Sequence, residues 1–265
     1  MGWVLLSRIA AGAFVVALPV FLVTTNVRYL AGEQRLYERG FRVHDADVAT
    51  GLPLSELDRA AAEIIDYFEN DAQTLRIVVE EDGEETALFD ARETTHMEDV
   101  KDLMRVVFRA NEVSLAFVLA YVGGVFIWAG QASARRLATL ALAGVGLGFA
   151  VVGIVGGFAL VGGFESTWDR FHEIAFRNDF WQLDPDTDRL IQMFPEPFWA
   201  EMTLLVGVLT VAEALVIVIA SVAAFVFTRG SNDDEAPRPS APDQVEAIRV
   251  RSRRVREARS ATHRS

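Results

Sequence analysis

The sequence predicts an all-α membrane protein, a four-transmembrane-helix bundle with a small α+β extracytoplasmic cap between spans one and two. Three observations lead to this prediction. Apolar residues make up 51% of the chain, and they gather in four long, uninterrupted runs. An acidic segment, too long for a plain connector, separates the first run from the second. Arginines gather in segments that four spans would place on one side of the membrane.

Each apolar run is close to, or above, the roughly 18–20 residues that a helix needs to cross about 30 Å of hydrocarbon. The first run follows Arg8 and could instead be a secretory signal. No small-x-small cleavage site follows Val23, which favours a retained anchor. The runs are Ile9–Val27, Val113–Gly130, Leu137–Val161 and Met202–Phe227.

These runs divide the chain into six segments. They are the first transmembrane helix (1–29), the extracytoplasmic cap (30–111), transmembrane helices two and three (112–163), an extracytoplasmic aromatic loop (164–199), the fourth transmembrane helix (200–228) and a disordered cytoplasmic tail (229–265). The tail is polar, contains several prolines and ends in an arginine-rich run, a composition that cannot bury enough apolar surface to fold.

The charge distribution predicts which side of the membrane each segment faces. The turn between spans two and three carries Arg135 and Arg136, and the tail holds nine arginines against six acidic residues. The predicted cap holds nine basic residues against twenty acidic ones, and residues 164–198 hold three against eight. The positive-inside rule therefore places both termini in the cytoplasm and both acidic segments outside. The net charge of −12 argues against nucleic-acid binding.

Three elements are expected within the cap. Ser55–Asp58 resembles a capping box that opens a helix running to Asn70. Leu75–Val79 and Thr86–Phe89 are predicted to pair as a hairpin, because an Asp-Gly turn signal lies between them. Thr95–Glu98 resembles a second capping box, and it is expected to open a helix that continues into span two.

The segment between the last two spans is unusually aromatic. Nine of the 36 residues in Phe164–Trp199 are aromatic and eight are acidic. Aromatic side chains next to a span are typical of the lipid–water boundary. We therefore expect this loop to rest at the interface and to hold a site there.

Two of the four histidines are candidates for chemistry. With Thr95 as N-cap, His96 would occupy the first turn of its helix, where the helix dipole disfavours the charged imidazolium. A neutral imidazole is what a general base requires. The alternative is a surface histidine beside a cap. We expect His44 to be solvated, and His263 lies in the tail.

His172 lies within the aromatic loop, and Asp169 precedes it by three residues. At this helical spacing the carboxylate can bond one ring nitrogen and orient the other. The alternative is a histidine that merely joins the aromatic belt. No cofactor or metal site is predicted, because the chain has no cysteine and no second histidine at zinc-binding spacing from His172.

Glu213 falls near the middle of span four, so its carboxyl group should face the bundle interior. It is either a polar packing contact or a proton-handling group. The glycines of span three, such as Gly144 and Gly148, suit close helix packing.

Two blocks of sequence resemble the signatures of a known family. FDARETTHMEDVKDLM at Phe89–Met104 and WDRFHEIAFRNDFWQLDPDTDRLIQMFPEPFW at Trp168–Trp199 are similar to the signature regions of four-span bacterial membrane proteins that include the lipoprotein intramolecular transacylase. The resemblance covers about residues 5–228 and includes the order of the spans and the sizes of the loops. It implies a multi-pass protein of the bacterial cell membrane, whose partners are lipoproteins and membrane lipid.

The resemblance also implies a reaction. An acyl chain would leave the glyceryl ester of a diacylglyceryl lipoprotein for the amino group of its N-terminal cysteine. The family's two functional histidines fall on His96 and His172. Of the two, His172 is our choice for the base, with Asp169 orienting it, and His96 would then donate a hydrogen bond to the oxyanion or the departing glyceryl oxygen. Arg170 and Lys101 are secondary candidates for oxyanion or head-group contacts.

Two other functions are weighed against this one. A non-catalytic membrane protein could use its acidic cap to bind a partner in the cell envelope. A proton-coupled transporter would rest on Glu213 alone, and four spans without repeats or broken helices do not favour it. The positions of the two histidines distinguish the transacylase from these alternatives, because catalysis requires the two side chains to face each other.

Overall fold

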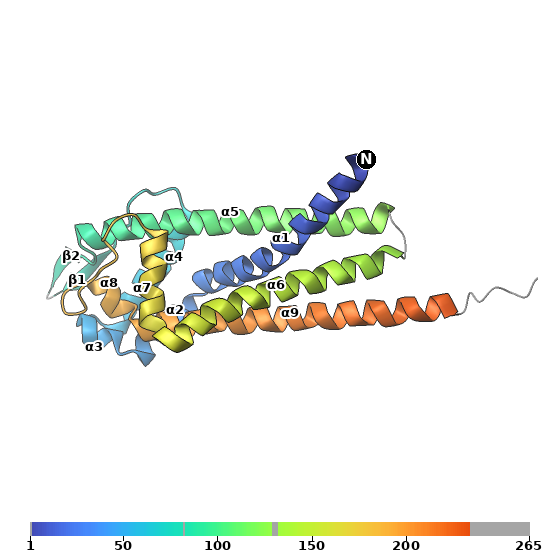
Figure 1. Ribbon diagram of the computed structural model, residues 1–265. Helices are drawn as coiled ribbons and strands as arrows, with labels where there is room; N and C mark the ends of the chain where they lie inside the picture. Colours follow the sequence, from blue (N-terminus) through green and yellow to red (C-terminus); the bar gives the residue numbers. More distant parts are fainter. Residues whose placement is uncertain (1, 82, 129–131, 234–265) are drawn as a thin grey trace, which may run out of the picture.

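Four long helices form the body of the protein (Figure 1). The computed structural model describes residues 2–81, 83–128 and 132–233. All four helices are long and apolar enough to cross a membrane, which confirms the predicted four-helix membrane architecture. They are α1 (Gly2–Gly32), α5 (Ala91–Trp128), α6 (Ala132–Gly162) and α9 (Glu196–Asp233). The predicted tail beyond Asp233 lies outside the described residues.

Helix α1 packs against the other three long helices. Phe14 and Leu18 of α1 are buried against side chains of α5, α6 and α9. Close approach to α6 is possible because Gly144 and Gly148 face α1: a Cβ at either glycine would lie 3.1 Å from an atom of α1. The small residues predicted to favour close packing do so at these two positions.

A polar contact ties α1 to α9 inside the bundle. Asn26 is 4% exposed, and its Nδ2 donates to Glu213 Oε2 at 3.0 Å and to Thr210 Oγ1 at 3.1 Å. Glu213 thus faces a neighbouring helix, as expected for a carboxyl group within an apolar span. Its contacts are those of a packing residue.

A second core lies at one end of the bundle, in a part we call the head. The head consists of residues 33–90 with the first turns of α5 and the segment from α8 to the start of α9. Its buried side chains include Phe41, Leu57, Tyr67, Met193 and Phe198. The elements between α1 and α5 are α2 (Gln34–Val43), α3 (Ala46–Thr50), α4 (Leu54–Glu69), β1 (Val78–Glu81) and β2 (Glu84–Ala87), and α8 (Arg189–Met193) precedes α9.

The head contains the predicted hairpin, with shifted limits. Strands β1 and β2 are antiparallel, and Val78 pairs with Ala87 while Glu81 pairs with Glu84. Gly83 has φ +84°, a left-handed conformation that glycine adopts without steric cost. Leu75 and Ile77, expected to begin the first strand, are instead buried in the core before β1 starts.

Both predicted capping boxes are wrong. Helix α4 begins at Leu54, and its N-cap Pro53 lies two residues before the expected cap, Ser55. Helix α5 begins at Ala91, where Asp90 and Glu93 form a reciprocal box: each backbone N–H donates to the other's carboxylate at 2.8 Å. An acidic pair can satisfy the first N–H groups as well as Ser or Thr with Glu, and it lies closer to the hairpin.

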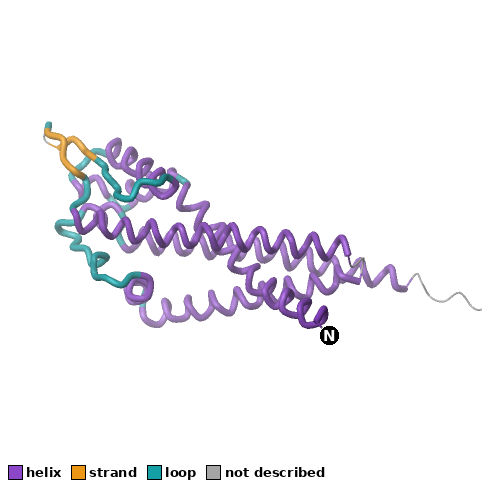
Figure 2. Tube along the Cα trace, turned by 90° about the horizontal axis from the view of Figure 1, so that it is seen from above, coloured by secondary structure: helices purple, strands orange, loops and turns teal. Residues whose placement is uncertain are grey.

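Helix α7 (Phe164–Ala175) crosses the bundle direction rather than continuing α6. Figure 1 shows it across the spans beside the head, and Figure 2 shows it nearly end-on. Gly163 separates the two helices with φ +83°, which a side chain would disfavour. The N-terminal end of α1, the end of α5 and the end of α9 all lie at the opposite end of the bundle (Figure 1).

Candidate active site

His96 of α5 and His172 of α7 lie together, although 75 intervening positions separate them in the sequence. Their ring centroids are 6.0 Å apart, and each residue is 7% exposed. The pair forms because α7 turns across the bundle and brings its last turn over the beginning of α5. His96 lies in the charged part of α5, before the predicted span that starts at Val113. His172 belongs to α7, which is not among the four described helices that are long and apolar enough to cross a membrane.

One ring nitrogen of His172 is held by the backbone. Nδ1 donates to the carbonyl oxygen of Trp168, at a distance of 2.8 Å. A carbonyl oxygen only accepts hydrogen bonds, so Nδ1 carries the hydrogen and Nε2 keeps its lone pair. The orienting partner is therefore this carbonyl group rather than the Asp169 carboxylate expected from the sequence. It lies four residues back, where the helix leaves a carbonyl within reach.

Aromatic side chains enclose the histidine pair. The indole ring of Trp181 stacks on His172 with centroids 5.0 Å apart and an interplanar angle of 26°. Trp168 meets His172 edge-on at 4.7 Å, and Phe176 meets the rings of His172 at 5.6 Å and His96 at 5.2 Å. The aromatics of the predicted interfacial loop thus line the site as well as flank the spans.

Burial disfavours the charged form of both imidazoles. It lowers the pKa of His96 to about 4, with the nearby His172 lowering it further and Asp99 opposing the change. Burial also lowers the pKa of His172, while the bond to Trp168 and the charge of Asp169 oppose this. The expectation of a neutral His96 agrees with this direction, but its reason was wrong. His96 lies in the second turn of α5, and desolvation, rather than the helix end, disfavours its charge.

His96 has an unsatisfied ring nitrogen. Its Nδ1 is buried and has no hydrogen-bond partner in the part of the chain that the structure describes. A buried polar atom without a partner is costly in a folded protein, and such atoms are often found where a ligand binds. The hydrogen-bonding capacity of this nitrogen is therefore unused within the described residues.

The supporting residues expected from the sequence lie in different places. Asp169 acts on His172 only through its charge. Arg170 is mostly exposed and pairs with Glu173 at 2.6 Å. Lys101 does not join the histidine pair: it is 1% exposed, and its Nζ donates to the carbonyl oxygen of Ala72 at 2.6 Å.

Four further residues near the pair were not among the predicted site residues. Arg92 and Asp99 lie on α5 at i−4 and i+3 from His96, so they share its face of the helix. Arg92 donates to backbone carbonyl groups of Asp179 and Gln182, and Asp99 accepts from Asn178. The helical spacing of Arg92, His96 and Asp99 was a signal that could have found two of them. Nothing local marks Asn178 or Trp181, since their roles depend on the path of a loop.

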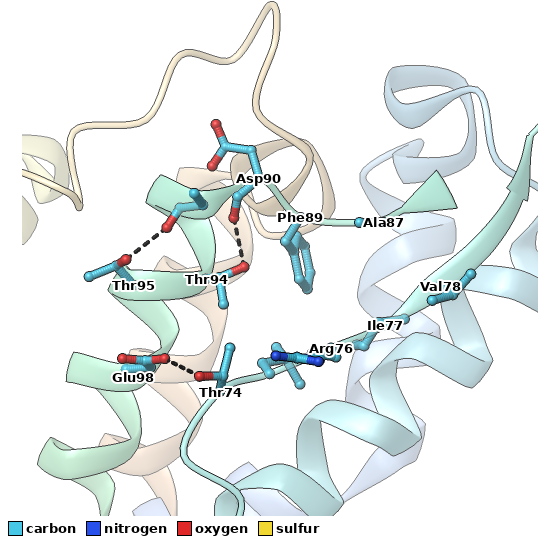
Figure 3. A pocket seen from close by; sticks show the side chains of 12 residues that line it. Thr74, Arg76, Ile77, Val78, Ala87, Phe89, Asp90, Thr94, Thr95 and Glu98 are labelled. Atoms are coloured by element: carbon cyan, nitrogen blue, oxygen red, sulfur yellow. Dashed lines mark hydrogen bonds between the residues drawn. The ribbon is translucent and has the colours of Figure 1, made fainter. Parts of the chain in front are cut away.

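A pocket of about 490 Å³ opens on another face of α5 (Figure 3). It lies between segment 74–78, segment 87–91 and the first turns of the helix, and it does not include either histidine. Its threonine hydroxyls are already engaged: Thr94 and Thr95 donate to backbone carbonyl groups one turn back, and Thr74 donates to Glu98. This pocket and the histidine pair are thus separate features.

The prediction for His44, the other histidine of the head, was wrong. His44 is not solvated: its side chain is 12% exposed, and Nε2 lies 3.6 Å from Glu201 Oε1. Among the described residues, no three His, Asp or Glu side chains are placed to hold a metal ion.

The fold and the site define a four-span integral membrane protein with a neutral, buried histidine pair beside one end of its bundle. Such a pair is suited to moving protons in a water-poor site. The model of one protein family, "Lipoprotein intramolecular transacylase Lit", matches residues 13–199. The chain therefore belongs to the lipoprotein intramolecular transacylase family, a family of membrane enzymes.

Solved structures agree with this assignment at the level of the fold. The membrane integral lipoprotein intramolecular transacylase Lit from Bacillus cereus has a TM-score of 0.63 at 16% identity, over 87% of this chain and 97% of that one. A variant of the same protein with a His-to-Ala mutation has a TM-score of 0.67 at 15% identity, over 84% and 96%. No curated protein sequence matches the chain.

Proposed function

We propose that His96 and His172 carry out the intramolecular transacylation of this family. The enzyme moves one acyl chain of a diacylglyceryl lipoprotein from the glyceryl ester to the amino group of the N-terminal cysteine. The observation that carries the residue assignment is the buried pair itself. Two neutral imidazoles lie 6.0 Å apart, and one has its tautomer set by a backbone carbonyl group.

His172 is the base in this proposal. An ammonium group must lose a proton before its nitrogen can attack an ester carbonyl, and Nε2 of His172 keeps a lone pair to accept it. The attack forms a C–N bond and a tetrahedral oxyanion. Collapse of that intermediate breaks the C–O bond to the glyceryl group, whose oxygen takes up a proton.

His96 is the donor in this proposal. A neutral imidazole carries one N–H, which can bond the oxyanion or protonate the departing glyceryl oxygen. The unsatisfied Nδ1 of His96 supports this role, because substrate binding would provide the partner that the protein does not. The ammonium group gives up two protons as it becomes an amide N–H. One reaches the departing glyceryl oxygen through the histidine pair, and the other passes from His172 to solvent, so both imidazoles end the cycle neutral.

The aromatic enclosure supports transfer over hydrolysis. Donor and acceptor belong to one substrate molecule, so no acyl-enzyme and no nucleophilic side chain are needed. Water would compete with the amine for the ester. Trp168, Phe176 and Trp181 surround the imidazoles and limit its access.

We further propose that the head is the extracytoplasmic cap between spans one and two, and that both termini are cytoplasmic. The head and α7 lie at one end of the bundle, and the outer ends of α1 and α9 lie at the other (Figure 1). This agrees with the arginine distribution, because Arg135 and Arg136 lie at the start of α6, at the same end of the bundle as the outer ends of α1 and α9 (Figure 1). The site then faces the outer leaflet, where lipoprotein and membrane lipid are its partners. The exposed Arg170 on α7 is placed to meet lipid or substrate head groups.

Lys101 has a different role in this proposal. Its ammonium group donates to Asn70 and Ala72 and lies 3.9 Å above the ring centroid of Tyr67. These contacts join α5 to the end of α4. We therefore assign Lys101 to the stability of the head rather than to the oxyanion.

The test is expression in a bacterium that lacks lipoprotein N-acylation, followed by mass spectrometry of lipoprotein N-terminal peptides. We expect an acyl group on the cysteine nitrogen with the wild-type chain and its loss with His96→Ala or His172→Ala. His44→Ala is the matched control, since this half-buried histidine lies outside the pair. Unchanged diacylglyceryl peptides with a well-expressed wild-type chain would instead favour a non-catalytic protein whose acidic cap binds an envelope partner.

A further inference from the structure

The first turns of α5 present a stripe of three polar side chains toward the loop after α7. Arg92, His96 and Asp99 follow one another at i, i+4 and i+7, so they lie along one face of the helix. Segment 178–182 runs along this stripe. It connects α7, which carries the other histidine, to α8.

Two side chains of the stripe hold the segment in place. Arg92 donates to the backbone carbonyl oxygens of Asp179, at 3.3 Å, and Gln182. Asn178 Nδ2 donates to Asp99 Oδ2 at 2.8 Å, and its Oδ1 accepts from the backbone N–H of Phe180 at 3.1 Å. The segment is therefore attached to α5 on both sides of the histidine.

Trp181 lies between these attachments. Its indole ring stacks on His172 with centroids 5.0 Å apart. The face of an indole ring attracts a cation, and the attraction is stronger where water is excluded. A ring held in this position favours the protonated form of the imidazole and limits its rotation.

We propose that Trp181 is a positioning residue for His172, held by Arg92 and by the Asn178–Asp99 bond, and that it stabilises the imidazolium formed when His172 takes the proton of the substrate amine. This inference rests on the proposed function. The step is a proton transfer from the ammonium nitrogen to Nε2, and Trp181 itself exchanges nothing.

Few charged groups act on His172. Asp169 of its own helix opposes the effect of burial on its pKa, and His96 of α5 faces it as a second neutral imidazole. Helix α9 contributes the uncharged Trp199, which stacks on Trp168 at 5.0 Å. A change at Trp181 thus acts on His172 without altering a neighbouring charge.

The experiment compares purified full-length wild type, Trp181→Leu and Trp181→Phe on a synthetic diacylglyceryl lipopeptide in lipid bicelles. For each, kcat and KM are measured separately between pH 4.5 and pH 9. Phe180→Leu is the matched control, because it removes the neighbouring ring of the same loop, for which no contact with His172 is described. Trp181→Phe keeps a stacking ring and guards against a general loss of structure.

A cation–π contribution of about 0.5–2 kcal/mol corresponds to about 0.4–1.5 pH units and to about a 2- to 30-fold change in rate. In Trp181→Leu we therefore expect kcat to fall by that factor, KM to change little and the acidic limb of kcat/KM to move to lower pH by that amount. Trp181→Phe should recover much of both changes, and Phe180→Leu should resemble wild type.

The direction in which the acidic limb of kcat/KM moves in Trp181→Leu distinguishes stabilisation of the imidazolium from simple exclusion of water. If Trp181 only kept water out, its removal would hydrate His172, raise its pKa and move the limb to higher pH. That result, or an unmoved limb, would overturn the inference while the transacylase function stands. An inactive wild-type enzyme would instead be a failure of the proposed function.

Discussion

The first turns of α5 present two faces that differ in almost every respect. One face lines an open pocket of about 490 Å³, where hydroxyl groups already have partners. The other carries His96, which is 7% exposed, keeps an unsatisfied nitrogen and meets a second histidine. The hollow alone therefore does not mark the site. Two facing imidazoles in a desolvated environment do, because desolvation changes the chemistry of a titratable group.

The largest expected effect tests whether the histidine face acts as one unit. General acid–base catalysis contributes about 10²–10⁴-fold, so His96→Gln and His172→Gln should each lower kcat by about that factor. Because both act in one proton-transfer sequence, the double variant should be hardly slower than the worse single variant. Purified enzymes are compared on the same lipopeptide, with folding checked by thermal unfolding. Multiplicative losses would show that the two rings act independently.

The next effect concerns pH and follows from burial. The pKa of His96 is lowered from 6.5 to about 4, so the unfolded chain binds a proton more readily than the folded one. Stability is therefore fully present above about pH 6.5 and declines as the pH falls from there toward about 4, by about 3 kcal/mol at most. Thermal unfolding across this range measures it, and His96→Gln should remove much of the decline. A flat profile in the wild type would contradict the burial of a neutral His96.

A smaller effect tests the charge beside the pair. The carboxylate of Asp169 opposes the lowering of the pKa of His172. In Asp169→Asn the pKa should fall further, and the acidic limb of kcat/KM should move to lower pH by a fraction of a unit, because this aspartate is exposed to solvent. Glu173→Gln, at another exposed carboxylate of α7, is the control. A limb that moves to higher pH would mean that Asp169 acts otherwise than through its negative charge.

The smallest effect is expected on the pocket face. Ala91 lines the pocket and is exposed, so Ala91→Trp should fill part of it without disturbing the histidines. We expect the activity on a short lipopeptide to stay within about twofold of wild type, the usual range for a surface change of this kind. Ala49→Trp, on the exposed side of α3, is the matched control. A large loss of activity in Ala91→Trp, but not in Ala49→Trp, would show that both faces of α5 belong to one site.

The sequence anticipated the outline well because its signals are local. Four apolar runs predicted four long helices, and an Asp-Gly turn predicted the hairpin, since each depends on neighbours along the chain. The predicted helix starts at Ser55 and Thr95 were wrong. Several residues near each start could serve as N-cap, and packing against the core determines which one does. The prediction of a solvated His44 was wrong, because its contact with Glu201 of the distant helix α9 leaves no signal in the local sequence.

The pairing of His96 with His172 was expected from a family resemblance. The contacts that the two side chains make with their neighbours were not expected. The sequence by itself determined the membrane architecture, the acidic head and the two candidate imidazoles, because hydropathy and residue type are properties of single segments. Only the tertiary structure decided that α7 turns across the bundle at Gly163 and that a carbonyl group holds His172. Only the tertiary structure placed Trp181 on that ring. Such contacts join residues far apart in the chain, and they depend on packing that no short stretch of sequence specifies.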